Sequence, residues 1–167
     1  GAGAAAETMG RLHDIGKCSE AYQRYIRQGD GARKGPDHST AGAKEAIGAY
    51  GLAGRLMAFG IAGHHGGLMD GERLTERRDK AVEPYPDWQA QAGELPAVGQ
   101  IQAGVVPTMK NAIAPAFSLA FRARMLFSCL VDADFLETER FYARSQGETE
   151  PARGGRVGQG HLDAVRA

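Results

Sequence analysis

The chain has 167 residues, and its 20 basic residues balance its 20 acidic ones to a formal net charge of zero. This length fits one domain with a real hydrophobic core. The neutral balance excludes a strong global attraction to polyanions, so any contact with nucleic acid depends on local basic patches. Cys18 and Cys129 lack metal-ligand spacing and are interpreted as reduced. No apolar run approaches the roughly 20 residues of a membrane span, so we expect a cytoplasmic protein without membrane contact.

The apolar spacing predicts an all-α fold in which one helical domain covers residues 1–145 and carries long irregular loops. Strong helix formers predict a first helix over residues 4–13. Ser19 caps a second helix, whose predicted buried side is Tyr22, Tyr25 and Ile26.

A third predicted helix begins at a cap, Asp37 or Ser39, and runs toward Tyr50. Gly51 interrupts the pattern, and a further amphipathic helix follows, with Leu52, Leu56, Phe59 and Ala62 on its apolar side. We expect this helix to end at His64-His65, before two glycines.

The stretch from residue 68 to residue 114 is weakly patterned and interrupted by prolines, and only residues 72–81 predict a helix clearly. Such a stretch is typical of a lid, a binding loop or disorder. Pro115 suits the first position of the longest helix, which is expected to reach Tyr142. Residues 146–167 are interpreted as a flexible tail or linker.

Four of the five histidines fall in three clusters, which are His13-Asp14, Asp37-His38 and His64-His65. Imidazole nitrogens and carboxylate oxygens together suit a first-row transition metal or a mixed pair of divalent ions. Taken singly, His13 also fits a hydrogen-bonded core histidine and His38 a surface histidine. The shared ligand chemistry of the clusters at helix ends nevertheless favours a metal site and indicates a metal-dependent hydrolase.

Two further residues are candidates for the same site. Lys17 offers a compact charge with three donors to a phosphate or a developing oxyanion, although a single lysine also fits solvated surface. Asp134 falls on the apolar stripe of the last helix with Leu126 and Leu130, whereas Asp132 falls on its polar side. A carboxylate on an apolar face needs a partner such as a cation, so Asp134 is preferred over Asp132 as the last ligand.

Four stretches together resemble the HD-superfamily nuclease domain of the CRISPR type I interference nuclease-helicase. They are Leu12-His13-Asp14-Ile15-Gly16-Lys17, His38-Ser39 with Ala41-Gly42-Ala43, Ile61-Ala62-Gly63-His64-His65-Gly66-Gly67, and residues 126–134. The resemblance covers most of residues 11–139. It implies an all-helical HD domain, one or two divalent metal ions, and cleavage of single-stranded DNA in antiviral defence.

The resemblance also implies roles for individual residues and partners. His13, Asp14, His38, His64, His65 and Asp134 take the metal-ligand roles, Asp14 and Lys17 the catalytic ones. The residues do not distinguish Mn, Ni, Mg, Co, Fe and Zn. The implied partners are single-stranded DNA, a CRISPR helicase and an RNA-guided surveillance complex.

Two features depart from the family pattern. The family carries a further ligand histidine before the His-Asp pair, and no histidine precedes His13. No phosphate-loop motif follows the domain either, because Gly154-Gly155 lacks the lysine and hydroxyl residue of such a loop. We therefore expect a domain that is clipped at its start, lies apart from its helicase and binds metal loosely.

Two other functions remain open at this point. One is an HD phosphohydrolase that acts on a nucleotide, which predicts a small closed pocket rather than an open groove. The other is a catalytically weakened HD module that docks a partner through residues 68–114. For the nuclease, the basic residues Arg33-Lys34 or Arg73, Arg77 and Arg78 are candidates to follow the DNA backbone.

Overall fold

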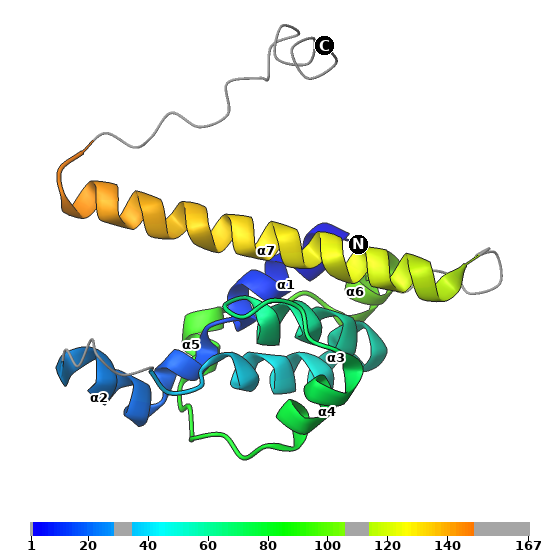
Figure 1. Ribbon diagram of the computed structural model, residues 1–167, viewed down its shortest axis with the longest axis horizontal. Coiled ribbons are helices and arrows are strands. Elements are labelled where there is room, and N and C mark those ends of the chain that lie inside the picture. The colour runs from blue at the N-terminus through cyan, green and yellow to red at the C-terminus, as the bar shows by residue number, and fades with distance from the viewer. Residues whose placement is uncertain (1, 29–34, 106–113, 149–167) are drawn as a thin grey trace, which may run out of the picture. The chain divides into compact units, whose positions relative to one another are not determined.

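The computed structural model describes residues 2–28, 35–105 and 114–148, and every regular element within them is a helix (Figure 1). The all-α prediction is therefore confirmed. The elements are α1 (Ala2–Leu12), the 3-10 helix η1 (Ile15–Cys18), α2 (Glu20–Gln28), α3 (Ser39–Gly63), α4 (Gly71–Asp79), α5 (Trp88–Ala92), α6 (Val98–Val105) and α7 (Pro115–Ser145).

The chain divides into two compact units, residues 1–133 and residues 134–167, and the division falls inside α7. All the histidine clusters belong to the first unit. The domain boundary expected at residue 145 stays a prediction, and most of the expected tail, residues 149–167, lies outside the described residues.

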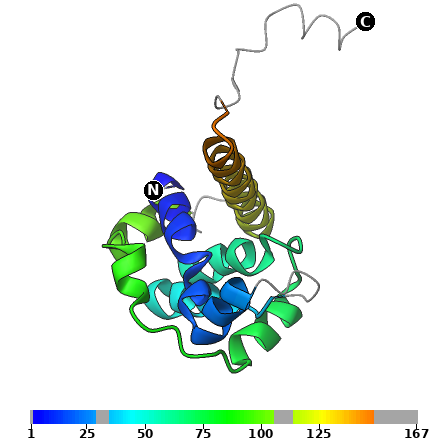
Figure 2. The same ribbon diagram turned by 90° about the vertical axis from the view of Figure 1, so that its left-hand side faces the viewer.

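Helix α1 forms because its sequence is rich in alanine, and it buries Ala5, Thr8, Met9 and Leu12 at three- and four-residue spacing. The buried Thr8 hydroxyl donates to the Ala4 carbonyl oxygen at 2.9 Å, so no polar atom of this side chain is left without a partner. Helix α1 contacts both α3 and α6, and it lies beside α6 in both ribbon views (Figures 1 and 2).

Helix α3 is a hairpin of two helical halves. Gly51, at φ 55° and ψ −122°, has a backbone conformation that side chains with a Cβ rarely adopt, so the predicted break at this residue is confirmed. Beyond it the second half packs antiparallel to the first. A Cβ at Gly54 would overlap the Ala46 carbonyl oxygen, and the Ser39 hydroxyl oxygen lies 3.5 Å from the Ala62 carbonyl oxygen. The start and the end of α3 therefore meet.

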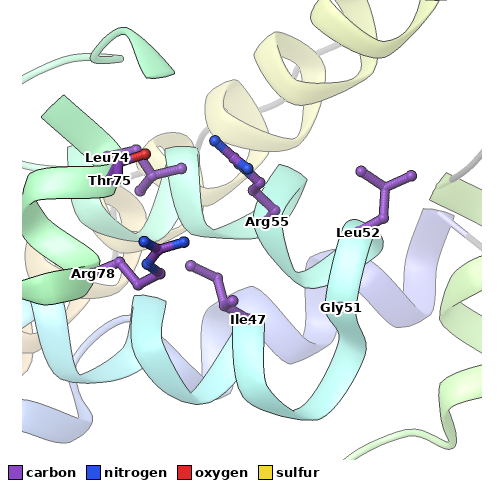
Figure 3. Close-up of a pocket in the computed structure, with 7 residues that line it drawn as sticks. All are labelled: Ile47, Gly51, Leu52, Arg55, Leu74, Thr75 and Arg78. Atoms are coloured by element: carbon purple, nitrogen blue, oxygen red, sulfur yellow. The ribbon is translucent and has the colours of Figure 1, made fainter. Parts of the chain in front are cut away.

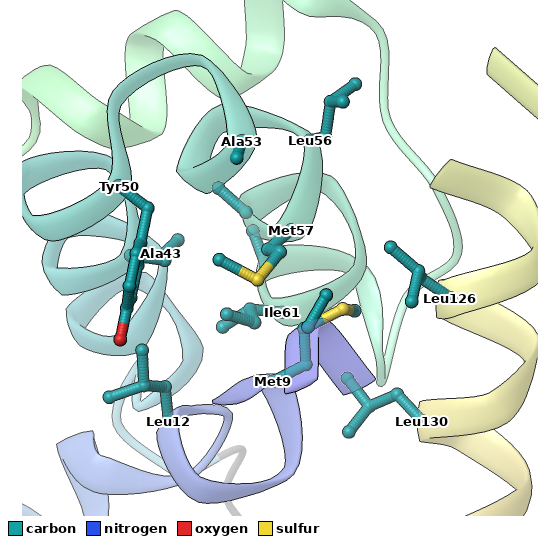
Figure 4. Close-up of a cluster of buried hydrophobic side chains, with 14 of the residues drawn as sticks. Met9, Leu12, Ala43, Tyr50, Ala53, Leu56, Met57, Ile61, Leu126 and Leu130 are labelled. Atoms are coloured by element: carbon teal, nitrogen blue, oxygen red, sulfur yellow. The ribbon is translucent and has the colours of Figure 1, made fainter. Parts of the chain in front are cut away.

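The core gathers side chains from α1, both halves of α3 and α7, which point toward one another in Figure 4. Met9, Leu12, Met57 and Ile61 are fully buried. From α7, which begins at Pro115 as predicted, Leu126 and Leu130 complete the cluster. The metal-ligand candidates of the first unit are thus carried on a packed core.

Three expectations about burial and helix formation were wrong. Ile26 and Leu52, predicted on apolar faces, are more than half exposed. Helix α2 buries no residue fully, because few described elements cover it. Residues 88–92 and 98–105, where the sequence pattern was weak, form α5 and α6.

Helix α3 meets the length and mean hydropathy of a membrane span, contrary to the expectation that no segment would. Its most apolar window is 61% buried within the protein. Because the hairpin at Gly51 divides it into two halves, each half is shorter than the roughly 20 residues that cross a bilayer. Burial in the core accounts for its apolar composition.

Candidate metal centre

The α3 hairpin brings three histidines to one end of the first unit. His38 is the residue before the first turn of α3, and His64 and His65 directly follow its last turn. The His64 side chain is fully buried and His65 is exposed. Residues 38 and 64 are far apart along the chain, so the centre depends on the antiparallel return at Gly51.

The turn after α1 brings Asp14 to the same place. Helix α1 ends at Leu12, one residue before the predicted end, so His13 and Asp14 lie in the turn that follows it. A Cβ at Gly16 would overlap the backbone of His38, and a Cβ at Gly42 would overlap the Leu12 carbonyl oxygen. Both glycines are therefore needed for close approach between backbones, which seats Asp14 against the start of α3.

Four ligand atoms, one each from Asp14, His38, His64 and His65, all lie within 4.8 Å of one another. The Asp14 Oδ1 atom lies 3.4 Å from His38 Nε2 and 3.6 Å from His64 Nε2. His65 Nε2 lies 3.0 Å from His38 Nε2. On the other carboxylate oxygen, Asp14 Oδ2, His13 Nε2 approaches to 3.2 Å. The two oxygens of one carboxylate thus face different rings.

Backbone carbonyl groups fix the orientation of three of these rings. The Nδ1 atoms of His13, His38 and His64 lie 2.8, 3.3 and 2.7 Å from the carbonyl oxygens of Gly10, Pro36 and Ile61. A carbonyl oxygen only accepts, so each Nδ1 must donate, and a neutral ring then carries its lone pair on Nε2. Every one of these Nε2 atoms faces Asp14. A backbone acceptor behind the ring is the usual support of a metal-ligating histidine.

The buried polar atoms of this centre fit a cation. Asp14 Oδ1 and His64 Nε2 are buried and make no hydrogen bond with any residue that the structure describes. Buried polar atoms normally have partners, and a carboxylate oxygen facing an imidazole lone pair is unfavourable unless a proton or a cation lies between them. Two donors about 2.1 Å from one ion are about 3.0–3.4 Å apart at ordinary ligand angles, close to the observed separations.

The electrostatics favour the ligating charge states. Burial raises the pKa of Asp14, but the rings of His13 and His64 and the Lys17 ammonium outweigh it and hold the pKa well below its ordinary value. Burial also lowers the pKa of His38, and the nearby Asp14 charge only partly opposes this. The ionised Asp14 carboxylate therefore faces the neutral His38 imidazole. These are the charge states in which both groups bind a divalent cation.

Lys17 lies beside the Asp14 carboxylate, and its expected place beside a phosphate stays a prediction. Its Nζ atom donates to Asp14 Oδ2 at 2.6 Å, and η1 sets this geometry because the Lys17 amide donates to the Asp14 carbonyl oxygen. Sequence reasoning missed Tyr22 as a neighbour of the centre. Its ring centroid lies 5.0 Å from that of His38 and 5.9 Å from Lys17 Nζ. The predicted apolar face of α2 gave no sign that Tyr22 would cover the histidine.

Arg77 makes hydrogen bonds within the protein, and its expected contact with a DNA backbone stays a prediction. Its guanidinium donates to the Ser39 and Thr40 hydroxyl groups at 2.8 and 3.3 Å and to the Ala62 carbonyl oxygen at 3.2 Å. It therefore ties together the start and the end of α3, directly behind the histidines. Arg78 pairs with Asp79 at 2.7 Å, and Arg73 is exposed. Of the other basic candidates, Arg33 and Lys34 lie outside the described residues.

Asp134 lies on α7, where it is partly buried while Asp132 is exposed. It is the first residue of the second unit. Its place as the last metal ligand stays a prediction. The structure brings together the remaining candidates, His13, Asp14, Lys17, His38, His64 and His65.

A cavity of about 530 Å³ lies beside this centre, and its lining includes Asp14 and Lys17 but none of the described histidines. Asp87 and Gln91, from the start and the end of α5, line another part. Sequence reasoning missed both residues, because α5 is a single short helix in a stretch without periodic apolar spacing.

A second cavity, of about 260 Å³, lies at the Gly51 end of α3 (Figure 3). Ile47, Leu52 and Leu74 line it together with Arg55 and Arg78. The described residues that line it include no histidine, cysteine or carboxylate. It therefore offers no ligand set for a metal ion.

Comparison of the chain with known protein families, with curated proteins and with solved structures finds no match. The resemblance to the HD nuclease domain therefore depends on the sequence motifs alone and stays a prediction.

Proposed function

We propose that the chain is a metal-dependent phosphodiesterase that hydrolyses single-stranded DNA. The observation that carries this proposal is the convergence of the Asp14 carboxylate and the Nε2 atoms of His38, His64 and His65. This donor set has the nitrogen and oxygen composition of a hydrolytic metal site. The HD motifs in the sequence favour DNA as the substrate, with a CRISPR helicase and surveillance complex as the partners.

A divalent ion would be held by Asp14, His38, His64 and His65. The second carboxylate oxygen of Asp14 would face the His13 ring. Such an ion lowers the pKa of a bound water toward neutrality and polarises the phosphate. The Nδ1 atoms of His38 and His64 donate to backbone carbonyl oxygens, which hold both rings in place before any ion binds. The rings therefore need little reorganisation when an ion binds. Lys17, on the cavity wall, supplies a positive charge to the phosphate oxygens.

The test is metal analysis combined with digestion of circular and linear single-stranded DNA in manganese. We expect bound metal and cleavage of single strands, with duplex DNA cut more slowly because the described fold offers no element that separates base pairs. Asp14→Ala should remove both metal and cleavage. Equal metal content in wild type and Asp14→Ala would refute the proposed site.

A further inference from the structure

The cavity beside the candidate metal centre has the size and composition of a ligand site. Its volume of about 530 Å³ falls within the roughly 300–1,000 Å³ typical of small-molecule pockets. Ile15 and Pro86 provide apolar surface, while Gln23, Asp87 and Gln91 provide polar atoms. Because Asp14 and Lys17 also line it, a molecule in this cavity would contact the carboxylate that faces the histidines, although none of the described histidines lines the cavity itself.

The charged side chains around the cavity would orient a bound molecule that carries a phosphate. Lys17, on the η1 side, is the cation next to Asp14. Arg11 also reaches the cavity. Like Lys17, which pairs with Asp14 at 2.6 Å, Arg11 is already paired, with Glu7 at 2.8 Å, and it also donates to the Ala92 carbonyl oxygen at 2.7 Å. On the α5 side stands the Asp87 carboxylate. A phosphate would therefore lie toward Lys17, and Asp87 would repel it.

The Asp87 side chain does not cap α5. Asp87 precedes α5 with a left-handed backbone, at φ 57° and ψ 14°, and makes no side-chain capping hydrogen bond. Its charge is nevertheless felt at the cavity, where burial and then Asp87 raise the pKa of Cys18. Gln91, four residues later on the same cavity wall, offers an amide donor and an amide acceptor.

We propose that this cavity seats one nucleotide of the DNA strand, with its phosphate at Lys17 and its base against Asp87 and Gln91. The inference rests on the proposed function and extends it to base preference. A carboxylate accepts a hydrogen bond from the exocyclic amino group of cytosine, and an amide both accepts from the amino group of adenine and donates to its ring N7. Thymine has no amino group, and its single ring N3–H is its one base donor, so it offers Asp87 and Gln91 fewer hydrogen bonds. The cavity therefore prefers bases that carry an amino group.

The chain contains a single tryptophan, Trp88, which directly follows Asp87 on α5 and is partly buried. Trp88 adjoins Asp87, which lines the cavity, so its fluorescence serves as the readout of binding without any need for turnover. The full-length chain is titrated with dCMP and with dTMP in the presence of Mg²⁺. We expect a saturable change with dCMP, and binding of dTMP weaker by about tenfold.

Three variants assign this effect to the cavity. Asp87→Gly removes the carboxylate while tolerating the left-handed backbone, and Gln91→Ala removes the amide. Each should weaken dCMP binding about tenfold and reduce the preference over dTMP. Gln89→Ala is the matched control, because Gln89 lies on the same helix, is exposed and does not line the cavity. Circular dichroism and metal content should match wild type in all three.

Equal affinities for dCMP and dTMP would overturn the inference, as would the same loss in Gln89→Ala as in Gln91→Ala. The titration and the cleavage assay separate the two proposals. Selective dCMP binding without DNA cleavage supports the nucleotide seat and refutes the hydrolase. DNA cleavage with unselective mononucleotide binding refutes the nucleotide seat alone.

Discussion

The two ends of the α3 hairpin differ in chemistry although one helix builds both. At the open end, His38, His64 and His65 surround the Asp14 carboxylate, and buried polar atoms there make no hydrogen bond with the described residues. At the Gly51 end, aliphatic side chains and two arginines line a cavity of about 260 Å³ (Figure 3). A cavity also lies beside the histidine end, but among the described residues Asp14 Oδ1 and His64 Nε2 at that end are the polar atoms whose burial calls for a ligand.

The contrast shows that a hollow alone does not identify a functional site. Burial of a polar atom without a partner costs free energy, about 1–3 kcal/mol for each group, so a fold keeps such atoms where a ligand compensates. The aliphatic cavity at Gly51 has no such cost to offset. If the histidine end carries the function and the Gly51 end contributes to stability alone, variants at the two ends should differ in their effects on metal binding.

Asp14→Ala is expected to have the largest effect, because Asp14 is the carboxylate that all the facing imidazoles share. Loss of a ligand and of its supporting contacts should reduce metal affinity and DNA cleavage by about 100-fold or more. Metal bound after dialysis and the initial rate on single-stranded DNA measure the two effects. Asp132→Ala, which removes an exposed carboxylate of α7, is the control and should match wild type.

His65→Ala is expected to weaken the metal centre less, by about tenfold. His65 is exposed, so its removal should leave the unfolding transition unchanged, whereas truncation of the buried His64 would also create a cavity. Competition with a chelator gives the change in metal affinity. Arg55→Ala, in the cavity at the Gly51 end, sharpens the comparison. If Arg55→Ala lowered metal affinity as much as His65→Ala, the two ends would not be functionally distinct.

Sequence patterns predicted the helices that are long and strongly periodic. The start of α7 at Pro115 and the break at Gly51 were both predicted, because proline and glycine restrict or free the backbone locally. Exposure was predicted less well, since the spacing of Ile26 and Leu52 marks an apolar face but not whether another element covers it. Short helices such as α5 have too few residues for a period to emerge.

The composition of the candidate site was predicted from residue chemistry, but its geometry was not. The sequence placed His38 and His64 at helix ends without indicating that the two ends meet, because the direction of the chain after Gly51 depends on packing. The need for glycine at position 16 likewise arises from the backbone of His38, which is distant in sequence. Contacts of this kind leave no local signal.

Gly54→Ala should destabilise the hairpin near its turn. The added Cβ would overlap the Ala46 carbonyl oxygen, and backbone atoms cannot move aside as a flexible side chain would. We expect a loss of about 3 kcal/mol in the free energy of unfolding, measured in urea. Gly48→Ala is the matched control, because its Cβ would meet open space, and it should stabilise α3 by about 0.5–1 kcal/mol. Equal stability of the two variants would mean that the halves of α3 are not in close contact.

Asp37→Asn tests the histidine end through acid stability. Asp37 accepts hydrogen bonds from the Thr40 amide at 3.2 Å and from the Thr40 hydroxyl at 2.7 Å. Burial raises the pKa of Asp37, but these bonds and the charges of Arg77 and Lys80 lower it from 3.8 to about 2. Because the folded-state pKa lies below the unfolded one, the ionised carboxylate stabilises the fold above about pH 4.

That contribution, about 2 kcal/mol at most, should be lost as the pH falls from about 4 to 2. Asparagine keeps the capping oxygen but cannot ionise, so the free energy of unfolding of Asp37→Asn should fall less steeply across this range than that of wild type. Urea unfolding in EDTA between pH 2 and pH 7 measures the difference and excludes metal release as its cause. Glu83→Gln, which replaces an exposed carboxylate, should follow the wild-type curve. If Asp37→Asn also followed it, the Asp37 carboxylate would not stabilise the start of α3.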